Sequence, residues 1–214
     1  LALENAGHIC LSVYSSGGFR QLGNATKPIH VPGDMKGMKW RTTKSPVEFM
    51  LVKTWGATPI PYDWSQLYSG LQSGVVEGQY VASPWQHVAK LHEVAKYFTE
   101  IGGMWSGNIL AMDAKQYNAL SSQEKKWLHE AADAYGEKVN ELDNAWIKNG
   151  EDAIKASAKE WYVPSEAEMS KWREGAIGAW LDAKGTFEPE IAKRVLLEQG
   201  MDGFVTQLEK AGAL

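Results

Sequence analysis

Short extended segments alternate with helical segments through the first half of the chain, and this order constrains the fold more than any other feature. Extended segments are predicted at 38–42, 58–62 and 75–82, each bounded by glycine or proline. Between them, Ser45 and Asp63 are expected to cap helices whose apolar residues recur at helical spacing. Strand–helix–strand–helix–strand order is typical of a mostly parallel sheet covered by helices. The sequence therefore predicts an α/β fold.

The opening of the chain contributes one more predicted strand. Residues 1–7 resemble the end of a helix stopped by a glycine, and they run directly into an extended segment at 8–14. The pair Gly17-Gly18 is expected to end that strand. No initiator methionine and no signal peptide stand at this point of the sequence. We therefore expect the chain to open in the middle of a longer protein.

The second half is predicted to be mainly helical. Residues 97–112 are expected to form two extended pieces. Ser121 and Glu124 then offer a capping box for a long helix, which is permitted because no proline lies between Pro84 and Pro164. Shorter helices are predicted at 83–96, 166–183, 189–199 and 202–211.

The charge and hydropathy of the chain exclude two classes of partner. The net charge is -4 and the lysines and arginines are mixed with acids, so no basic stripe is available to bind nucleic acid. No stretch approaches the roughly 18 consecutive apolar residues of a membrane span. We expect neither a nucleic-acid partner nor a chain embedded in the membrane.

No arrangement of catalytic or metal-binding residues stands out. The five histidines form no HxH or HExxH pattern, so no metal site is expected. The GxSxG, GxGxxG and GxxxxGK[ST] patterns are absent, which argues against a hydrolase nucleophile and a bound nucleotide cofactor. Cys10 has apolar neighbours and is expected to be a buried thiol rather than a nucleophile. The sequence therefore predicts no catalytic residue and no cofactor.

Arg41 is the residue that most suggests recognition chemistry. It lies between Trp40 and Thr42 on a predicted strand, so it faces away from the core if Trp40 faces toward it. Ligands of open α/β sheets bind beyond the strand ends, and a planar guanidinium suits a carboxylate better than any other side chain. The alternative is an exposed arginine at the sheet edge, and spacing alone does not decide between the two.

Five segments resemble one known family. They are 34–41 (DMKGMKWR), 56–61 (GATPIP), 65–79 (SQLYSGLQSGVVEGQ), 91–97 (LHEVAKY) and 120–132 (LSSQEKKWLHEAA). In order and spacing they resemble sequence motifs of the DctP family, the solute-binding proteins of TRAP transporters. Two of these motifs are DxKGxKxR and S-E-x-Y-x-A-L-Q-x-G. The resemblance covers roughly residues 15–135, and the tail past about residue 151 matches only in its helical character.

The resemblance implies a two-lobed, type II periplasmic binding-protein fold with a long helix that spans both lobes. Family members carry a further stretch before this chain's first residue, so the first lobe is expected to be incomplete. Residues 1–106 are expected to form mostly the second lobe, with the ligand-anchoring arginines. Residues 107–150 would return into the partial first lobe and form the connecting helix, and 151–214 would add helices that pack on the second lobe.

The resemblance also implies a function without catalysis. Solute-binding proteins of this family capture a small organic anion in the periplasm by lobe closure and deliver it to the membrane subunits of the transporter. The arginine that anchors the ligand's carboxylate corresponds to Arg41, a second arginine to Arg20, and an aromatic residue that lies against the ligand to Trp64. The alternatives are a loop cation for Arg20 and a core tryptophan for Trp64.

The chain departs from the family pattern at positions that contact the ligand. The family's D-G-Q-E-N-P is EGQYVA at 77–82, which keeps Gln79 but replaces the ligand-binding asparagine by Val81, and a histidine of the next strand is replaced by Gly103. Tryptophans that could enclose an apolar group are Trp64, Trp85 and Trp105. We therefore expect an anion with an apolar, aromatic or quaternary-ammonium part rather than a sugar acid.

An enzyme that uses the same cleft, for example a small-acid lyase, is the alternative function. Such an enzyme needs a titratable residue beside Arg41 to act as an acid or base, and Glu77 is the candidate for this residue in the sequence. A capping or surface carboxylate is the other interpretation of Glu77. A helical scaffold built on the C-terminal half is a third interpretation, which leaves the strand–helix half unexplained.

Overall fold

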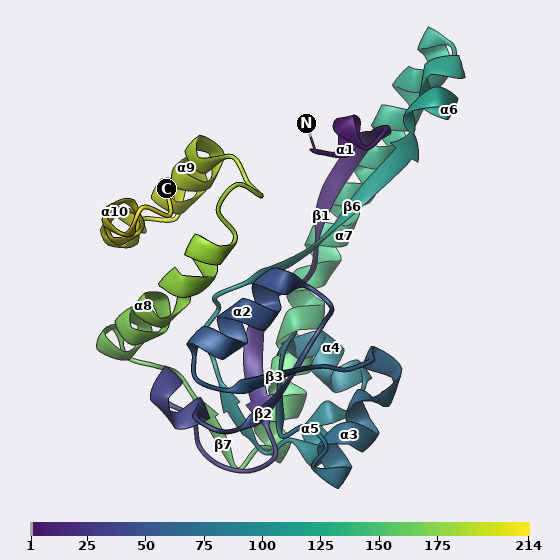
Figure 1. Ribbon diagram of the computed structural model, residues 1–214. Coiled ribbons are helices and arrows are strands. Elements are labelled where there is room, and N and C mark those ends of the chain that lie inside the picture. Colours follow the sequence, from purple (N-terminus) through teal and green to yellow (C-terminus); the bar gives the residue numbers. More distant parts are fainter. Residues whose placement is uncertain (1) are drawn as a thin grey trace. The chain divides into compact units, whose positions relative to one another are not determined.

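The computed structural model of the chain describes residues 2–214 (Figure 1). Contacts within the chain divide it into two compact units. Unit 1 holds the residues up to Arg20, Ala82–Val88 and Gly102–Ala156, and unit 2 holds Gln21–Val81, Ala89–Ile101 and Ser157–Leu214. Each unit is therefore built from segments that lie far apart in the sequence.

The sheet of unit 2 is mixed. Its strands are β2 (Lys39–Thr42), β3 (Thr58–Pro61), β4 (Gly78–Ala82), β5 (Tyr97–Thr99), β7 (Glu160–Tyr162) and the end of β1 (His8–Asn24). Their order is β3-β2-β4-β1-β5-β7. β2 pairs in parallel with β3 and β4, and β7 with β5, whereas β1 is antiparallel to β5. The predicted α/β class and the strands at 38–42 and 58–62 are confirmed, and the strand predicted at 75–82 is present from Gly78 onward.

The helices between these strands begin and end where local signals predict. α2 (Pro46–Thr54) is capped by Ser45, whose hydroxyl accepts a backbone N–H of the first turn at 3.4 Å. The next helical segment consists of a short 3₁₀ helix, η2 (Trp64–Gln66), followed by α3 (Leu67–Ser73). Gly74 ends it in the left-handed conformation, with φ 73°.

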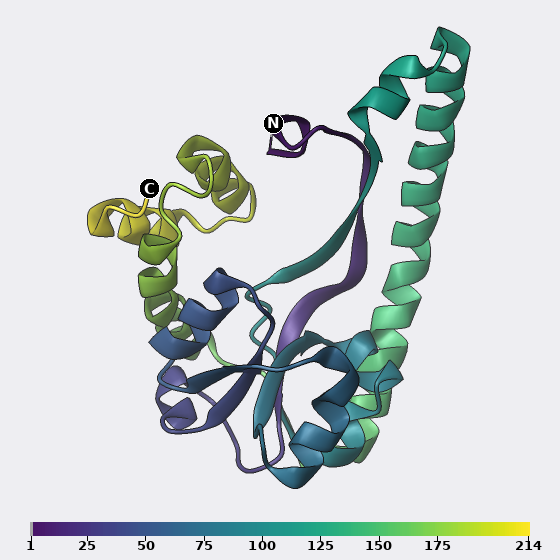
Figure 2. The same cartoon turned by 45° about the vertical axis from the view of Figure 1, so that its right-hand side comes forward.

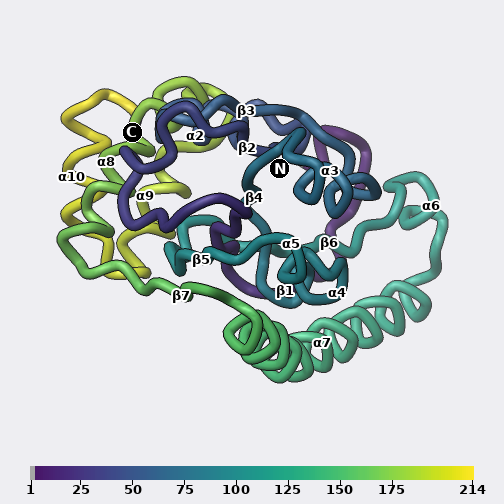
Figure 3. The backbone as a smooth tube through the Cα atoms, turned by 90° about the horizontal axis from the view of Figure 1, so that it is seen from below, coloured from purple at the N-terminus to yellow at the C-terminus, as the bar shows by residue number. Residues whose placement is uncertain are grey.

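The C-terminal helices of unit 2 are also confirmed. α8 (Glu166–Asp182) packs against α2 (Figure 3). The indole Nε1 of Trp55 donates to the carbonyl oxygen of Trp172 at 3.3 Å. α9 (Pro189–Glu198) and α10 (Asp202–Ala211) follow. Together they enclose a small core whose buried residues are Leu196, Phe204, Val205, Leu208 and Ala213.

Unit 1 combines a two-stranded ribbon with a long helix. The first part of β1 pairs antiparallel with β6 (Trp105–Asp113). α7 (Ser122–Ser157), a helix of 36 residues, runs beside this ribbon over part of its length (Figure 2). The predicted capping box is present: Ser121 Oγ accepts from Glu124 N at 3.3 Å, and a Glu124 carboxylate oxygen accepts from Ser121 N at 2.7 Å. Neither α7 nor any other helix within 2–214 is long and apolar enough to cross a membrane.

The pair Gly17-Gly18 does not end β1, so this part of the prediction was wrong. Both glycines have positive φ, 93° and 69°, and the shift of register between Ser15 and Gly18 marks a β-bulge. Asp143, on α7, accepts a hydrogen bond from the Gly17 backbone N–H at 2.9 Å. A buried carboxylate from a distant helix therefore holds the irregular backbone within one continuous strand.

Three shorter elements also differ from the prediction. The helix expected at 83–96 is two helices, α4 (Ser83–Val88) and α5 (Leu91–Val94), separated by Lys90 in the left-handed conformation. α6 (Ala114–Ala119) and the three-residue strand β7 were not predicted. The opening helix is present as α1 (Ala2–Asn5), and residue 1 lies outside the described residues.

Cys10 is exposed, so the predicted buried thiol was wrong. Its neighbour Leu11 is buried, whereas Val13 is 55% exposed. The register between β1 and β6 shifts between Cys10 and Ser12, so buried and exposed side chains do not alternate strictly here. Apolar neighbours in the sequence therefore do not decide the burial of Cys10.

Candidate functional site

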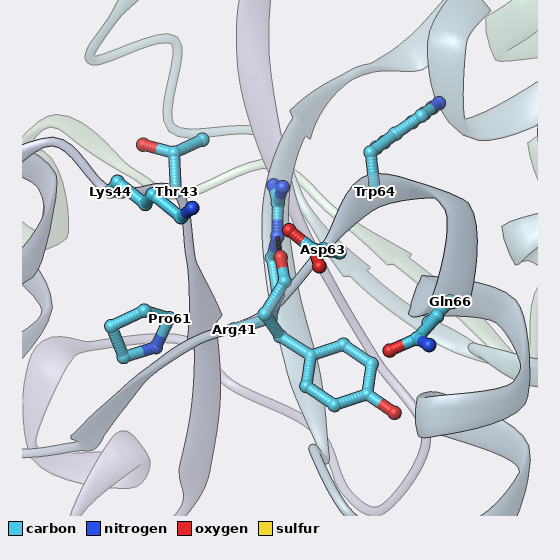
Figure 4. Close-up of a pocket in the computed structure, with 8 residues that line it drawn as sticks. Arg41, Thr43, Lys44, Pro61, Asp63, Trp64 and Gln66 are labelled. Atoms are coloured by element: carbon cyan, nitrogen blue, oxygen red, sulfur yellow. Dashed lines mark hydrogen bonds between the residues drawn. The ribbon is translucent and has the colours of Figure 1, made fainter.

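A pocket of about 580 Å³ opens in unit 2 beyond the ends of β2 and β3 (Figure 4). The residues that line it are Arg41, Thr43, Lys44, Pro61, Tyr62, Asp63, Trp64 and Gln66. They come from the last residues of the two strands, the segments that follow them, and η2. β2 and β3 are parallel, and ligands of open α/β sheets bind beyond the carboxyl ends of parallel strands.

Arg41 brings a positive charge to this pocket from β2. It lies opposite Ile60 of β3 and is only 6% exposed. Its Nε donates to the carbonyl oxygen of Tyr62 at 3.1 Å, and its Cζ lies 5.9 Å from the ring centroid of Trp64. A buried cation requires such compensating contacts. The alternative of an exposed arginine at a sheet edge is therefore wrong.

Trp64 and Asp63 form the wall contributed by η2. Trp64 is 41% exposed, so it is not a core tryptophan, which was the alternative for this position. Asp63 occupies the N-cap position of η2, but its side chain accepts no capping hydrogen bond, contrary to the prediction. Its carboxylate lines the pocket with Arg41 instead (Figure 4).

A buried carboxylate holds the segment that follows Arg41. Glu48, 1% exposed on the first turn of α2, accepts hydrogen bonds from the backbone N–H of Thr43 at 3.1 Å and from the Thr43 hydroxyl. The same hydroxyl accepts from Ser45 N at 3.2 Å. These bonds fix the backbone on both sides of Lys44, the second cation of the pocket lining.

Two of the predicted site residues lie on β4 of unit 2. Gln79 is completely buried and Val81 is 8% exposed. Neither is among the residues that line the pocket. Their burial follows from the position of β4 between β2 and β1 in the sheet.

The other predicted site residues belong to unit 1. Arg20 donates from Nε to Ser106 Oγ at 3.2 Å. Trp85 donates from its indole to the carbonyl oxygen of Ser16 at 3.1 Å and packs edge-on against Trp146, with 5.1 Å between ring centroids. Trp105, on β6, is 46% exposed. The structure thus brings Arg41 and Trp64 together in one pocket, and their roles and those of the unit 1 residues stay predictions.

Glu77, the residue considered as the catalytic acid or base of an enzyme, forms a hydrogen bond with a strand of the sheet instead. A carboxylate oxygen accepts from Lys39 N at 2.7 Å, and Glu77 does not line the pocket. Among residues 2–214, no group of three or more His, Cys, Asp or Glu side chains is placed to hold a metal ion.

Several pocket residues were missed by the reasoning from sequence. They are Thr43, Lys44, Pro61, Tyr62, Asp63 and Gln66. One signal was available: Thr43 and Lys44 follow the predicted strand at 38–42, and Asp63 follows the predicted strand at 58–62. Polar residues at the carboxyl ends of adjacent parallel strands meet at one edge of the sheet.

The sequence model of one family, described as bacterial extracellular solute-binding protein, family 7 (DctP), matches residues 2–185. The chain belongs to this family. The predicted resemblance is therefore confirmed over a longer stretch than the motifs that suggested it.

Two relatives of this DctP-family chain are named as periplasmic binding proteins. The ectoine-binding periplasmic protein TeaA of Halomonas elongata is 29% identical over 150 residues, which are 70% of this chain and 43% of TeaA. The 2,3-diketo-L-gulonate-binding periplasmic protein YiaO of Escherichia coli K12 is 29% identical over 135 residues, 63% of this chain and 41% of YiaO. The chain spans less than half the length of these relatives.

Solved structures of the family show the same fold. A TRAP periplasmic solute-binding protein from Shewanella oneidensis with bound succinate superimposes with a TM-score of 0.80 and 19% identity, over 96% of this chain and 64% of that one. The predicted periplasmic binding-protein fold with a long helix is confirmed.

Proposed function

We propose that this DctP-family chain captures a small organic anion outside the cytoplasm, in the periplasm, and delivers it to the membrane subunits of a TRAP transporter. The buried guanidinium of Arg41 in a pocket at the carboxyl ends of parallel strands carries the proposal. A guanidinium that is already desolvated and oriented binds a carboxylate strongly. Membership in a family of extracellular solute-binding proteins supports the same function.

The proposed mechanism is closure of two lobes over the solute, as the family resemblance implies. Closure would exclude water and strengthen the pair between Arg41 and the carboxylate. Further proposed ligand contacts are Arg20, Trp64, Gln79, Val81, Trp85 and Trp105. The expected division into lobes, 1–106, 107–150 and 151–214, is part of this proposal.

The proposed solute is a carboxylate with an apolar, aromatic or quaternary-ammonium part. The half-exposed indole of Trp64 beside Arg41 supports it, because an aromatic face suits such groups. TeaA is named as ectoine-binding, whereas YiaO is named for a sugar acid, 2,3-diketo-L-gulonate. Thermal-shift measurements with aromatic, aliphatic and sugar acids test this class. Stabilisation by sugar acids alone would contradict it.

Calorimetry followed by recovery of the solute tests capture against catalysis. A binding protein is expected to return the bound acid chemically unchanged after prolonged incubation. An altered acid would favour the alternative, a lyase-like enzyme, although Glu77 lies outside the pocket lining.

A further inference from the structure

The carboxylate of Asp63 makes no hydrogen bond that stabilises the fold. Asp63 stands at an N-cap position, where aspartate normally accepts a backbone N–H of the following helix, yet no such bond forms. Asp63 is exposed, and within the described chain its side chain takes part in no hydrogen bond or ion pair with another protein group, although its backbone carbonyl accepts from Gln66 N at 3.2 Å. The acid nevertheless lines the pocket beside Arg41 (Figure 4).

The charges around the pocket differ from those of a simple anion site. Arg41 and Lys44 are positive and Asp63 is negative, so two cations and one anion leave a net charge of +1 on the lining. One bound carboxylate neutralises this charge. A second carboxylate on the same solute would make the occupied pocket negative and would lie near Asp63.

We infer that Asp63 is a specificity-determining residue, which selects solutes that carry one carboxylate and a hydrogen-bond-donating or cationic group over dicarboxylates. The inference rests on the proposed function, because Arg41 is taken to hold the first carboxylate. The solute's second group then faces an acceptor that has no other partner in residues 2–214. A hydroxyl, amide or ammonium group satisfies this acceptor, whereas a carboxylate repels it.

Matched acids that differ only in their second group test the inference. One set consists of succinate, succinamate and 4-aminobutanoate, and an aromatic set of terephthalate, 4-carbamoylbenzoate and 4-(aminomethyl)benzoate. In whichever set the pocket binds, calorimetry is expected to show that the amide and the amine bind about tenfold more tightly than the dianion. In Asp63→Asn this preference should fall by about tenfold, mainly through gained affinity for the dianion.

Two further variants make the outcome decisive. Asp182→Asn removes the same charge from an equally exposed position at the end of α8, outside the pocket lining, and should leave the preference unchanged. Arg41→Lys should weaken all members of a set together. If the dianion binds as well as the amide in the unaltered protein, or if Asp63→Asn changes nothing while Arg41→Lys still weakens binding, the inference is wrong and the proposed function stands. Binding of none of the acids would overturn both.

Discussion

Arg41 and Tyr62 are joined by a hydrogen bond from the Nε of the guanidinium to the backbone carbonyl oxygen, at 3.1 Å across 21 residues of sequence. The bond connects β2 to the residue that follows β3, and it depends on the register that places Arg41 opposite Ile60. The guanidinium plane is therefore oriented by strand pairing before any solute arrives. Such preorganisation reduces the ordering that binding would otherwise require.

Arg41→Lys is predicted to weaken binding of the solute by about tenfold or more, because lysine lacks both the planar fork and the Nε–H that Tyr62 accepts. Isothermal titration calorimetry with the best-binding acid measures the change. Arg194→Lys, an exposed position on α9, is the control and should bind as the unaltered protein does. Unchanged affinity in Arg41→Lys would remove Arg41 from the site.

Two neighbouring threonines are predicted to respond oppositely to the same substitution. The Thr43 hydroxyl bridges Ser45 N and the buried Glu48, so Thr43→Val should lower the free energy of unfolding by about 1–3 kcal/mol. The Thr42 hydroxyl is buried and has no hydrogen-bond partner in the described part of the chain, so Thr42→Val should be neutral or stabilising. Urea denaturation of both variants checks this, and equal losses would contradict it.

Gly150→Ala is predicted to destabilise unit 1. A Cβ at this position of α7 would lie 2.6 Å from Pro84 Cα and 2.7 Å from Pro84 N, and backbone atoms cannot give way as a side chain can. We expect a loss of about 1–3 kcal/mol in thermal or urea unfolding, despite the better helix propensity of alanine.

The matched control is Gly203→Ala in α10. Nothing lies within 4 Å of a Cβ there, so this helical glycine should gain up to about 1 kcal/mol from the same substitution. If the free energies of unfolding of Gly150→Ala and Gly203→Ala were equal, α4 and α7 would not be in close backbone contact at Gly150.

Glu168 is predicted to make part of the stability depend on acid pH. Hydrogen bonds from the Ser165 hydroxyl and backbone N–H, and from the Tyr162 hydroxyl, lower the pKa of its carboxyl from 4.5 to about 2. Because the folded-state pKa is depressed, this contribution is fully present above pH 4.5 and is lost as the pH falls from 4.5 to about 2.

Unfolding of Glu168→Gln as a function of pH measures this contribution. The difference in stability from the unaltered protein should be largest near neutral pH and should shrink toward pH 2. Glu188→Gln, at the start of α9, removes a carboxylate whose side chain makes no capping bond and is the control for the loss of one negative charge. A pH-independent difference for Glu168→Gln would contradict the assignment.

Local signals in the sequence were enough to locate most helices and the strands of the first half. Ser45 caps α2 and Ser121 with Glu124 caps α7 through bonds that span only three residues, so their energetics are contained in a short segment. Arg41 was also selected as a candidate site residue from local sequence, by its place on an alternating strand and by the motif around it. Its burial and its hydrogen bond to Tyr62 could not be predicted from that local sequence.

Interactions between distant segments decided the rest. Gly17-Gly18 carries a strong local signal for a break, yet Asp143 holds it within β1 from 126 residues away. β7 is too short to have a pattern and exists because β5 supplies its hydrogen bonds.

Asp63 shows the same division at the pocket. Its sequence context predicted a cap, because aspartate before a helix gains a local hydrogen bond. The structure instead leaves its carboxylate among Arg41, Lys44 and Trp64, which pairing of β2 with β3 brings to one edge of the sheet. The chain thus encodes its helices and strands by short-range hydrogen bonds and periodicity. The charge arrangement of the pocket arises only when strand pairing places segments about 20 residues apart side by side.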